Sequence, residues 1–355
     1  MAAWYTLPGL IRSDRSGRFD EITATIGANL DAVLKAADPA AARTALAEAQ
    51  AQLAAARAAA PAGDARLPDL ERRVADAAAT LDRVTEVTDI RRLAEVKNIA
   101  TVPLQSVSLV GAASLWMVDH SRGRVAAVDP QGGTSREVYR SGERYDGAVA
   151  RDPVAAAWDE QGQRLLVIDG ERTLWSIAGT SAPVRLPLRG VAELRSVTAL
   201  AAYGGNIYLL DGRGGEVWRY LPAGAGFDSE RTGLLGGVSF NDARELVVDG
   251  DVFVLDGGSL RHFRQGTAQD SLLQGIDRAP QSPVSLVEDV GRGRFYTLES
   301  GARRVIVGDR GGAFVGQLRH QAFLDAKSIA LSPDGSTLYV LTNDALLAID
   351  PLQAR

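Results

Sequence analysis

The chain has 355 residues, of which 46% are hydrophobic and 23% are charged, and its formal net charge is −5. This balance is ordinary for a soluble globular protein, and it argues against a nucleic-acid partner, since phosphate binding needs a clustered basic surface. The chain has no cysteine, which excludes disulfides, thiolate zinc sites and cysteine nucleophiles.

The first 18 residues form a segment that is distinct in composition. Residues 2–11 are mostly apolar and include the adjacent aromatics Trp4 and Tyr5, and three arginines follow by residue 18. Aromatic side chains mark membrane interfaces, so one interpretation is the last turn of a membrane helix, with an anchor upstream of Ala2. The other interpretation is a loose terminus that docks on a neighbouring part of the protein.

Residues 19–97 carry a helical pattern. Apolar residues recur at intervals of three and four from Phe19 to Val33. Asp38 and Pro39 then form an N-cap and first-turn proline, which predicts the start of an alanine-rich second helix. Pro61 is expected to end that second helix.

A third helix is expected from about residue 70. Leu70, Val74, Ala77, Leu81 and Val84 step by four and three residues, which is the seam of a coiled coil, and the helix is expected to run to about residue 96. We expect an antiparallel hairpin with the first helix as a third member. It serves as a stalk, a spacer or a dimerisation element, or alternatively as a cap packed on the C-terminal domain.

From residue 98 onward the helical pattern is replaced by a repeated strand–turn–strand phrase. The second strand of each copy ends at one of six residues, which are Asp119, Asp169, Asp211, Asp256, Glu299 and Thr342. A fixed period of 40 to 50 residues indicates one structural unit repeated, and each copy holds four strands separated by glycine turns. The sequence therefore predicts an all-β six-bladed β-propeller over residues 98–355, preceded by the helical segment.

The ends of this region predict how the ring closes. The last copy stops at its third strand, residues 345–350, so its outer strand has to come from elsewhere in the chain. Residues 98–104 precede the first inner strand, and we expect them to complete the sixth blade.

The acidic residues at the strand ends have two interpretations. Five acids at equivalent places suggest metal binding or catalysis. However, an Asp that begins a tight turn also accepts hydrogen bonds from backbone amides two residues on, and we favour this capping role.

The repeat resembles a known group of propellers. A strand, an Asp, a short glycine-containing turn, a basic residue and a Val, as in residues 119–125 and 211–217, are similar to the NHL-type repeat, although the usual turn Asn is missing. The resemblance covers about residues 100–351. It implies a non-catalytic, ligand- or protein-binding sensor or scaffold, as in the extracytoplasmic part of bacterial membrane-anchored signalling proteins. A cytoplasmic scaffold is the alternative location.

A more distant resemblance implies the alternative function. Lactonase and gluconolactonase propellers hold a divalent metal in the central channel through Glu, Asn and Asp, and they are metal-dependent hydrolases. No Glu heads the first inner strand, residues 106–110, where that family would need one. We therefore expect no metal, no cofactor and no catalytic residue.

No nucleophile elbow, phosphate-binding loop or zinc-protease motif is present, and His120 and His262 are expected to be exposed in or next to turns. The loops that enter the inner strands are the expected recognition face, because loops on a rigid scaffold carry function. This face is expected to bind a protein or small-molecule ligand. Its candidate residues are Arg144, Tyr145, Asp152, Arg195, Asn241, Asp242, Arg278 and Lys327.

Overall fold

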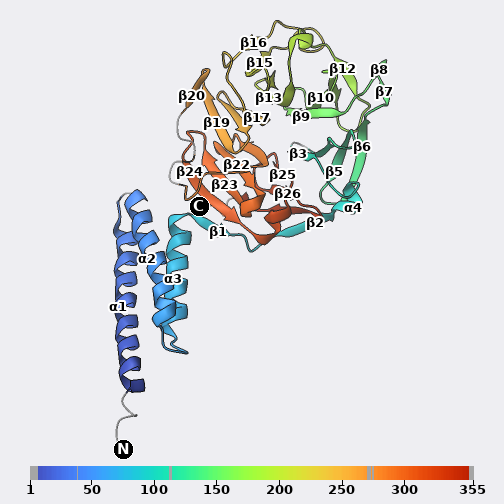
Figure 1. Ribbon diagram of the computed structural model, residues 1–355. Helices are drawn as coiled ribbons and strands as arrows, with labels where there is room; N and C mark the ends of the chain where they lie inside the picture. The colour runs from blue at the N-terminus through green and yellow to red at the C-terminus, as the bar shows by residue number, and fades with distance from the viewer. Residues whose placement is uncertain (1–6, 38, 112–113, 270–272, 274–275, 352–355) are drawn as a thin grey trace, which may run out of the picture. The chain divides into compact units, whose positions relative to one another are not determined.

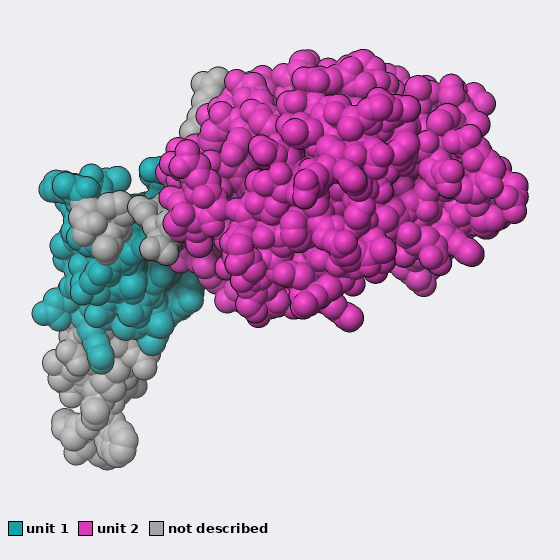
Figure 2. Space-filling model, turned by 90° about the horizontal axis from the view of Figure 1, so that it is seen from above, with its two compact units in different colours: residues 1–84 teal, residues 85–355 magenta. Residues whose placement is uncertain are grey.

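The computed structural model describes residues 7–37, 39–111, 114–269, 273 and 276–351. The chain divides into two compact units, residues 1–84 and residues 85–355, which are coloured separately in Figure 2. The expected segment at residues 2–5, including Trp4 and Tyr5, lies outside the described residues.

The first unit is a bundle of three helices, α1 (Leu7–Lys35), α2 (Pro39–Ala59) and α3 (Arg66–Leu81), which lie side by side in Figure 1. Helix α2 begins at Pro39, as its first-turn proline predicts. One apolar cluster draws on all three helices and includes Phe19, Ile26, Leu46 and Leu70. No helix in the described part of the chain is long and apolar enough to span a membrane.

The third helix is shorter than the sequence predicts. It ends at Leu81 rather than near residue 96, and Arg83 adopts a positive φ of 47° that no helix accommodates. The chain then becomes extended in β1 (Val84–Glu86). The seam spacing at Val84 is therefore fortuitous, and the β-branched residues that follow it favour a strand.

The second unit is a ring of six sheets, five of four strands and one of five (Figure 1). The first three blades, from inner to outer strand, are β3 (Val107–Gly111), β4 (Leu115–Asp119), β5 (Arg124–Asp129) and β6 (Thr134–Arg140); β9 (Pro153–Asp159), β10 (Arg164–Asp169), β11 (Leu174–Ile177) and β12 (Val184–Leu186); and β13 (Val197–Tyr203), β14 (Asn206–Asp211), β15 (Glu216–Tyr220) and β16 (Thr232–Gly233). A hairpin of β7 (Arg144–Tyr145) and β8 (Ala148–Val149) lies between the first two blades in sequence.

The last three blades follow the same plan. They are β17 (Ala243–Val248), β18 (Val252–Asp256), β19 (Ser259–Arg264) and β20 (Thr267–Gln269); β21 (Ser285–Asp289), β22 (Arg294–Glu299), β23 (Arg304–Asp309) and β24 (Phe314–Arg319), with β1 at the outer edge; and β25 (Ser328–Leu331), β26 (Leu338–Leu341) and β27 (Ala345–Ile349), with β2 (Arg91–Glu95). The five predicted acids each end the second strand of a blade, and the six-bladed propeller is confirmed.

The ring closes as expected in principle, but with a different strand. The outer strand of the sixth blade is β2, in which Arg91 pairs with Ala348 and Glu95 with Ala345. Residues 98–104, predicted for this role, instead form the end of the short helix α4 (Val96–Ile99) and the segment that crosses to the first blade. Pro103 in this segment has no N–H to donate to a neighbouring strand, which disfavours a strand there. The true closing strand, β2, lies inside the range that the sequence predicts to be helical, residues 19–97.

The core of the ring consists of apolar layers between neighbouring blades. One layer joins the first two blades through Trp116, Val118, Val125 and Trp175, which are almost fully buried. The equivalent layer between the third and fourth blades includes Leu210 and Phe263. Both faces of most strands are therefore buried, which leaves the innermost strand of each blade to line the centre of the ring.

Closure by β2 makes a testable prediction about truncated chains. A chain of residues 98–355 lacks β2 and exposes the edge of β27, so we expect its free energy of unfolding to fall by about 3 kcal/mol. A chain of residues 89–355 also lacks β1 but keeps β2, and it serves as the control. Equal denaturation midpoints for the two chains would contradict the closure.

Candidate functional site

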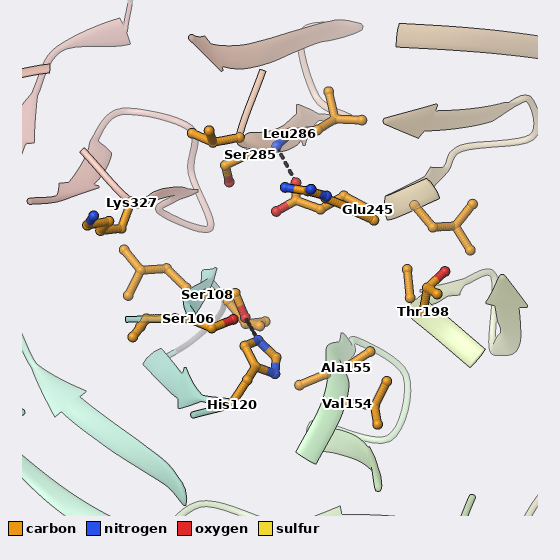
Figure 3. Close-up of a pocket in the computed structure, with 18 of the residues that line it drawn as sticks. Ser106, Ser108, His120, Val154, Ala155, Thr198, Glu245, Ser285, Leu286 and Lys327 are labelled. Atoms are coloured by element: carbon orange, nitrogen blue, oxygen red, sulfur yellow. Dashed lines mark hydrogen bonds between the residues drawn. The ribbon is translucent and has the colours of Figure 1, made fainter. Parts of the chain in front are cut away.

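The innermost strands surround a central channel with a volume of about 880 Å³ (Figure 3). Strands β3, β9, β13, β17 and β21 line it together with the segment that enters β25. The polar side chains in its wall include Ser106, Ser108, His120, Thr198, Glu245, Ser285 and Lys327. A cavity of this size with a few polar groups is the usual form of a small-molecule site.

The acids that end the second strands do not take part in this channel. Asp119, Asp169, Asp211, Asp256 and Glu299 are all at most 4% exposed. The Asp169 carboxylate accepts hydrogen bonds from the Glu171 and Thr173 amides in its own turn, at 3.0 and 2.9 Å. It also accepts from the Trp175 indole at 2.8 Å. The turn-capping interpretation is therefore confirmed for this residue.

The same carboxylates also hold the loop that enters the inner strand of their blade. Asp169 accepts from the Arg151 amide at 3.2 Å. Asp211 accepts from the Arg195 and Ser196 amides at 2.9 and 2.8 Å. Glu299 accepts from the Gln281 amide, and Asp256 accepts from two successive amides, at 2.8 Å each. Each carboxylate thus fixes the backbone of the recognition face.

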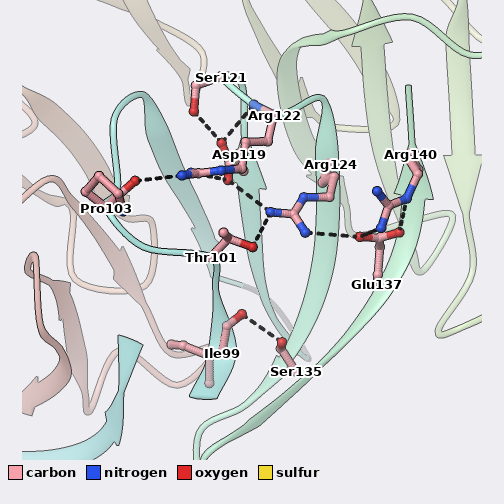
Figure 4. A network of polar contacts seen from close by, with 10 residues as sticks. All are labelled: Ile99, Thr101, Pro103, Asp119, Ser121, Arg122, Arg124, Ser135, Glu137 and Arg140. Atoms are coloured by element: carbon pink, nitrogen blue, oxygen red, sulfur yellow. Dashed lines mark hydrogen bonds and ion pairs between the residues drawn. The ribbon is translucent and has the colours of Figure 1, made fainter. Parts of the chain in front are cut away.

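The first blade uses its acid differently (Figure 4). Asp119 accepts from the Ser121 hydroxyl at 2.6 Å and from the Arg122 amide at 3.1 Å. The Arg122 and Arg124 guanidinium groups pair with Asp119 and also donate to the Pro103 carbonyl and the Thr101 hydroxyl. This network ties the crossing segment, residues 98–104, to the ring.

Glu245, on β17, is the most perturbed acid of the channel wall. It accepts a hydrogen bond from the Leu286 amide, and the Ser285 hydroxyl also bonds to it. The side chain is half-buried in a channel surrounded by protein, and this burial raises the pKa of Glu245 to about 7. The carboxyl group therefore changes its charge near neutral pH.

Ser285 belongs to a chain of hydrogen bonds that crosses three blades. Its hydroxyl lies 3.3 Å from the hydroxyl of Ser328, and the Leu109 amide donates to Ser328 at 2.9 Å. These residues lie on β21, β25 and β3, the inner strands of the fifth, sixth and first blades. The position of Glu245 is therefore linked through hydrogen bonds to the inner strand of the first blade.

His120 bridges the first two blades. Its Nδ1 lies 2.9 Å from the Pro153 carbonyl oxygen, which can only accept, so Nδ1 carries the proton. Its Nε2 lies 2.9 Å from the Ser108 hydroxyl and accepts from it. Burial lowers the pKa of His120, and the imidazole is therefore neutral at pH 7. The expected exposed position of His120 is wrong, and so is that of His262, which is buried against Phe253.

A groove continues the channel outward between the third and fourth blades. It has a volume of about 570 Å³ and shares Thr198, Asp242 and Ala243 with the channel. The Thr198 hydroxyl is buried and has no hydrogen-bond partner within the described residues.

The donor set does not fit the divalent metal that the lactonase resemblance implies. Within the described part of the chain, no three His, Asp or Glu side chains come close enough together to hold a metal ion. In the channel wall, the Asp242 carboxylate is paired with Arg244 rather than directed at Glu245.

The eight predicted face residues are distributed over the ring. Lys327 and Asp242 line the channel, and Asn241 and Asp242 line the groove. Asp152 and Arg195 are exposed on loops whose backbones are fixed by hydrogen bonds. These residues remain candidates for contact with a ligand or partner.

The other three face residues have their own contacts. Tyr145 packs between Tyr139 and Trp175, with ring centroids 5.9 and 6.1 Å away. Arg144 is exposed and donates to the Gly147 carbonyl at 2.8 Å. The Arg278 carbonyl accepts from the buried Arg304 guanidinium.

Sequence reasoning missed Glu245 and Thr198. Both lie on inner strands in which apolar and polar residues alternate as in any strand. Only the geometry of the ring shows which of the alternate positions face the channel. A usable signal exists in β17, where Glu245 is an acid between the apolar residues Ala243 and Leu246 rather than at a turn.

Comparison with known proteins supports the fold. No protein family and no curated protein matches the sequence. A protein of unknown function from Bacteroides thetaiotaomicron VPI-5482 has a similar structure, with a TM-score of 0.53 and 14% identity over 74% of this chain and 75% of that chain.

Two lyases align less closely. A streptogramin B lyase gives a TM-score of 0.44 and 8% identity over 74% of this chain and 97% of its own. A virginiamycin B lyase from Staphylococcus aureus gives 0.47 and 8% over 74% and 98%. Neither likeness carries an argument about the fold or the activity of this chain.

The carboxylates at the strand ends make a testable prediction. Asp169→Ala leaves the amides of Arg151, Glu171 and Thr173 without their acceptor, so we expect the free energy of unfolding to fall by about 3 kcal/mol. Asp152→Ala removes an exposed carboxylate nearby and should change stability by less than about 0.5 kcal/mol. Urea denaturation measures both, and similar losses in the two variants would contradict the structural role.

Glu245 makes a prediction about pH. Its pKa is raised in the folded state from the ordinary value of 4.5, so folding takes up protons and stability falls as pH rises from about 4.5 to 7. Glu245→Gln should remove this contribution, and its melting temperature relative to wild type should rise over that interval. Burial also raises the pKa of Glu288, to about 9, so the melting temperature of Glu288→Gln relative to wild type should rise over the same interval and continue to rise up to about pH 9, whereas that of Glu245→Gln should level off near pH 7. A difference between Glu245→Gln and wild type that does not vary with pH would refute the assignment.

Proposed function

We propose that residues 85–355 form a non-catalytic, ligand-binding propeller that takes a small polar molecule into its central channel. The observation that carries this proposal is the contrast between two sets of polar groups. The acids at the strand ends accept hydrogen bonds from backbone amides, whereas Glu245 and Lys327 line the channel and form no ion pair within the described residues.

The surroundings of the channel suit a binding protein. The loop backbones at its mouth are held by buried carboxylates, so the site is organised before a ligand arrives and little ordering entropy is lost on binding. The groove beside Asn241 and Asp242 extends the site across the recognition face, where a longer ligand or a protein partner can make contact.

The sensor role is the finer part of this proposal. The strand, acid, turn and Val repeat resembles the NHL-type propellers of membrane-anchored signalling proteins, and a helical unit precedes the ring in the chain. In this proposal the helices dimerise or transmit the bound state, and the chain is the extracytoplasmic part of a bacterial signalling protein. The reading frame upstream of Ala2 tests the location, because a cytoplasmic scaffold requires no hydrophobic segment there.

One observation favours a hydrolase as a second candidate, although one without the divalent metal of the lactonase type, which the donor set does not fit. A carboxyl group with a pKa near 7 is well suited to general acid–base catalysis at neutral pH, and Glu245 has this property. Lactone hydrolysis that is present in the wild type and lost in Glu245→Gln would favour the enzyme. Binding without turnover favours the sensor.

Channel occupancy makes a prediction that a single variant can test. Ser106 is exposed and lines the channel, so Ser106→Trp should obstruct it without disturbing the core. We expect native mass spectrometry with a pool of water-soluble metabolites to show adducts on the wild type, and at least a tenfold weaker signal on the variant, since about 1.4 kcal/mol of lost binding is sufficient.

Arg303→Trp is the matched control, because Arg303 is an exposed position outside the channel wall. Adducts that persist on Ser106→Trp, or that disappear equally from the control, would place the ligand elsewhere or implicate a general effect of tryptophan.

A further inference from the structure

The charged side chains of the channel wall are few, and their pairing is uneven. Arg244 pairs with Asp242, and the Arg244 Nε lies 2.8 Å from a carboxylate oxygen of Asp242. Among the described residues, no ion pair involves Glu245 or Lys327. Among the half-buried charged side chains of the wall, one carboxyl group and one ammonium group thus have no ion-pair partner, whereas the Asp325 carboxyl group, which also lines the channel, is exposed to solvent.

Glu245 is held in a fixed position. The Leu286 amide and the Ser285 hydroxyl bond to its carboxyl group, and Ser285 is itself fixed by the Ile329 amide at 3.3 Å. In Figure 3 Glu245 lies beside β21, whereas Lys327 lies to one side on the segment that enters β25. The two groups therefore come from different blades.

Keeping these charges apart inside the ring costs free energy. A half-buried carboxylate without a cation is poorly solvated, as at Glu245. Burial at Glu245 is strong enough to move its titration to neutral pH. Groups of this kind, facing a cavity, are characteristic of a binding site whose ligand supplies the missing charges.

The remaining polar groups of the wall add hydrogen bonds but no charge. His120 is neutral, because its Nδ1–H donates to the Pro153 carbonyl and burial disfavours a second proton. Ser106 is exposed in the wall and contributes a hydroxyl. A ligand with one positive and one negative group therefore matches the unpaired charges of this wall.

We propose that the channel binds a zwitterionic small molecule of the amino-acid or short-peptide class, with its ammonium group at Glu245 and its carboxylate at Lys327. This inference rests on the proposed function as a ligand-binding channel. The groove that shares Thr198 and Asp242 with the channel offers space for the rest of the molecule.

The test uses the full chain and two pools of probes, the free L-amino acids and a set of dipeptides with free termini. Each pool is compared with its N-acetylated form, which lacks the ammonium group, and with its C-amidated form, which lacks the carboxylate. We expect the free pools to raise the melting temperature, and each blocked form to bind at least tenfold more weakly in titration calorimetry.

Two variants assign the ends of the ligand. Glu245→Gln should lose the preference for free over N-acetylated probes, and Lys327→Gln should lose the preference for free over C-amidated probes. Arg195→Gln and Asp152→Asn are the matched controls, because both remove an exposed charge on loops that enter inner strands but do not line the channel.

The outcomes separate this inference from the broader function. If the blocked pools bind as well as the free pools, the proposal of a zwitterionic ligand is wrong and the channel function stands. The same conclusion follows if the free pools do not bind but other metabolites bind to the wild type and not to Ser106→Trp. If no metabolite binds in a manner that Ser106→Trp abolishes, both proposals fail.

Discussion

The structure depends on a buried carboxylate at the end of the second strand of a blade. In the second to fifth blades this group accepts hydrogen bonds from the amides of the loop that enters the inner strand. Asp169 and Asp211 also accept from amides of the turn that follows them, so each connects the loop to the turn. A carboxylate buried to this degree is tolerable only because backbone amides and nearby cations satisfy it. The same bonds hold the mouth of the channel at fixed positions.

This arrangement separates structural acids from acids available to a ligand. The repeated acids are conspicuous in the sequence, but their carboxylates accept hydrogen bonds from the backbone and are not available to a ligand. Glu245 lies within a strand, outside the repeat, and keeps its carboxyl group directed into the channel wall. The periodic signal therefore describes how the blades are built, and departures from it indicate where the molecule is open to recognition.

The blades could be predicted from the sequence because each one repeats a local code of buried strand, acid and turn. The limits of the helical unit could not, because the spacing from Leu70 to Val84 continues a helical seam by chance and the positive φ of Arg83 is not signalled by a glycine. The closing strand β2 was missed for the same reason, since it had been included in that helix. The channel residues require knowledge of which strand faces which neighbour, and this emerges only when the ring is closed.

The route of the chain into the ring has a mechanical consequence. On leaving α3 it adds β1 to the fifth blade and then β2 to the sixth, and the Val87 amide bonds to the Arg319 carbonyl between them. A force that pulls on the helices is therefore borne first by the short β1 and only afterwards by β2. β1 can therefore detach from the fifth blade under tension while β2 keeps the ring of blades closed.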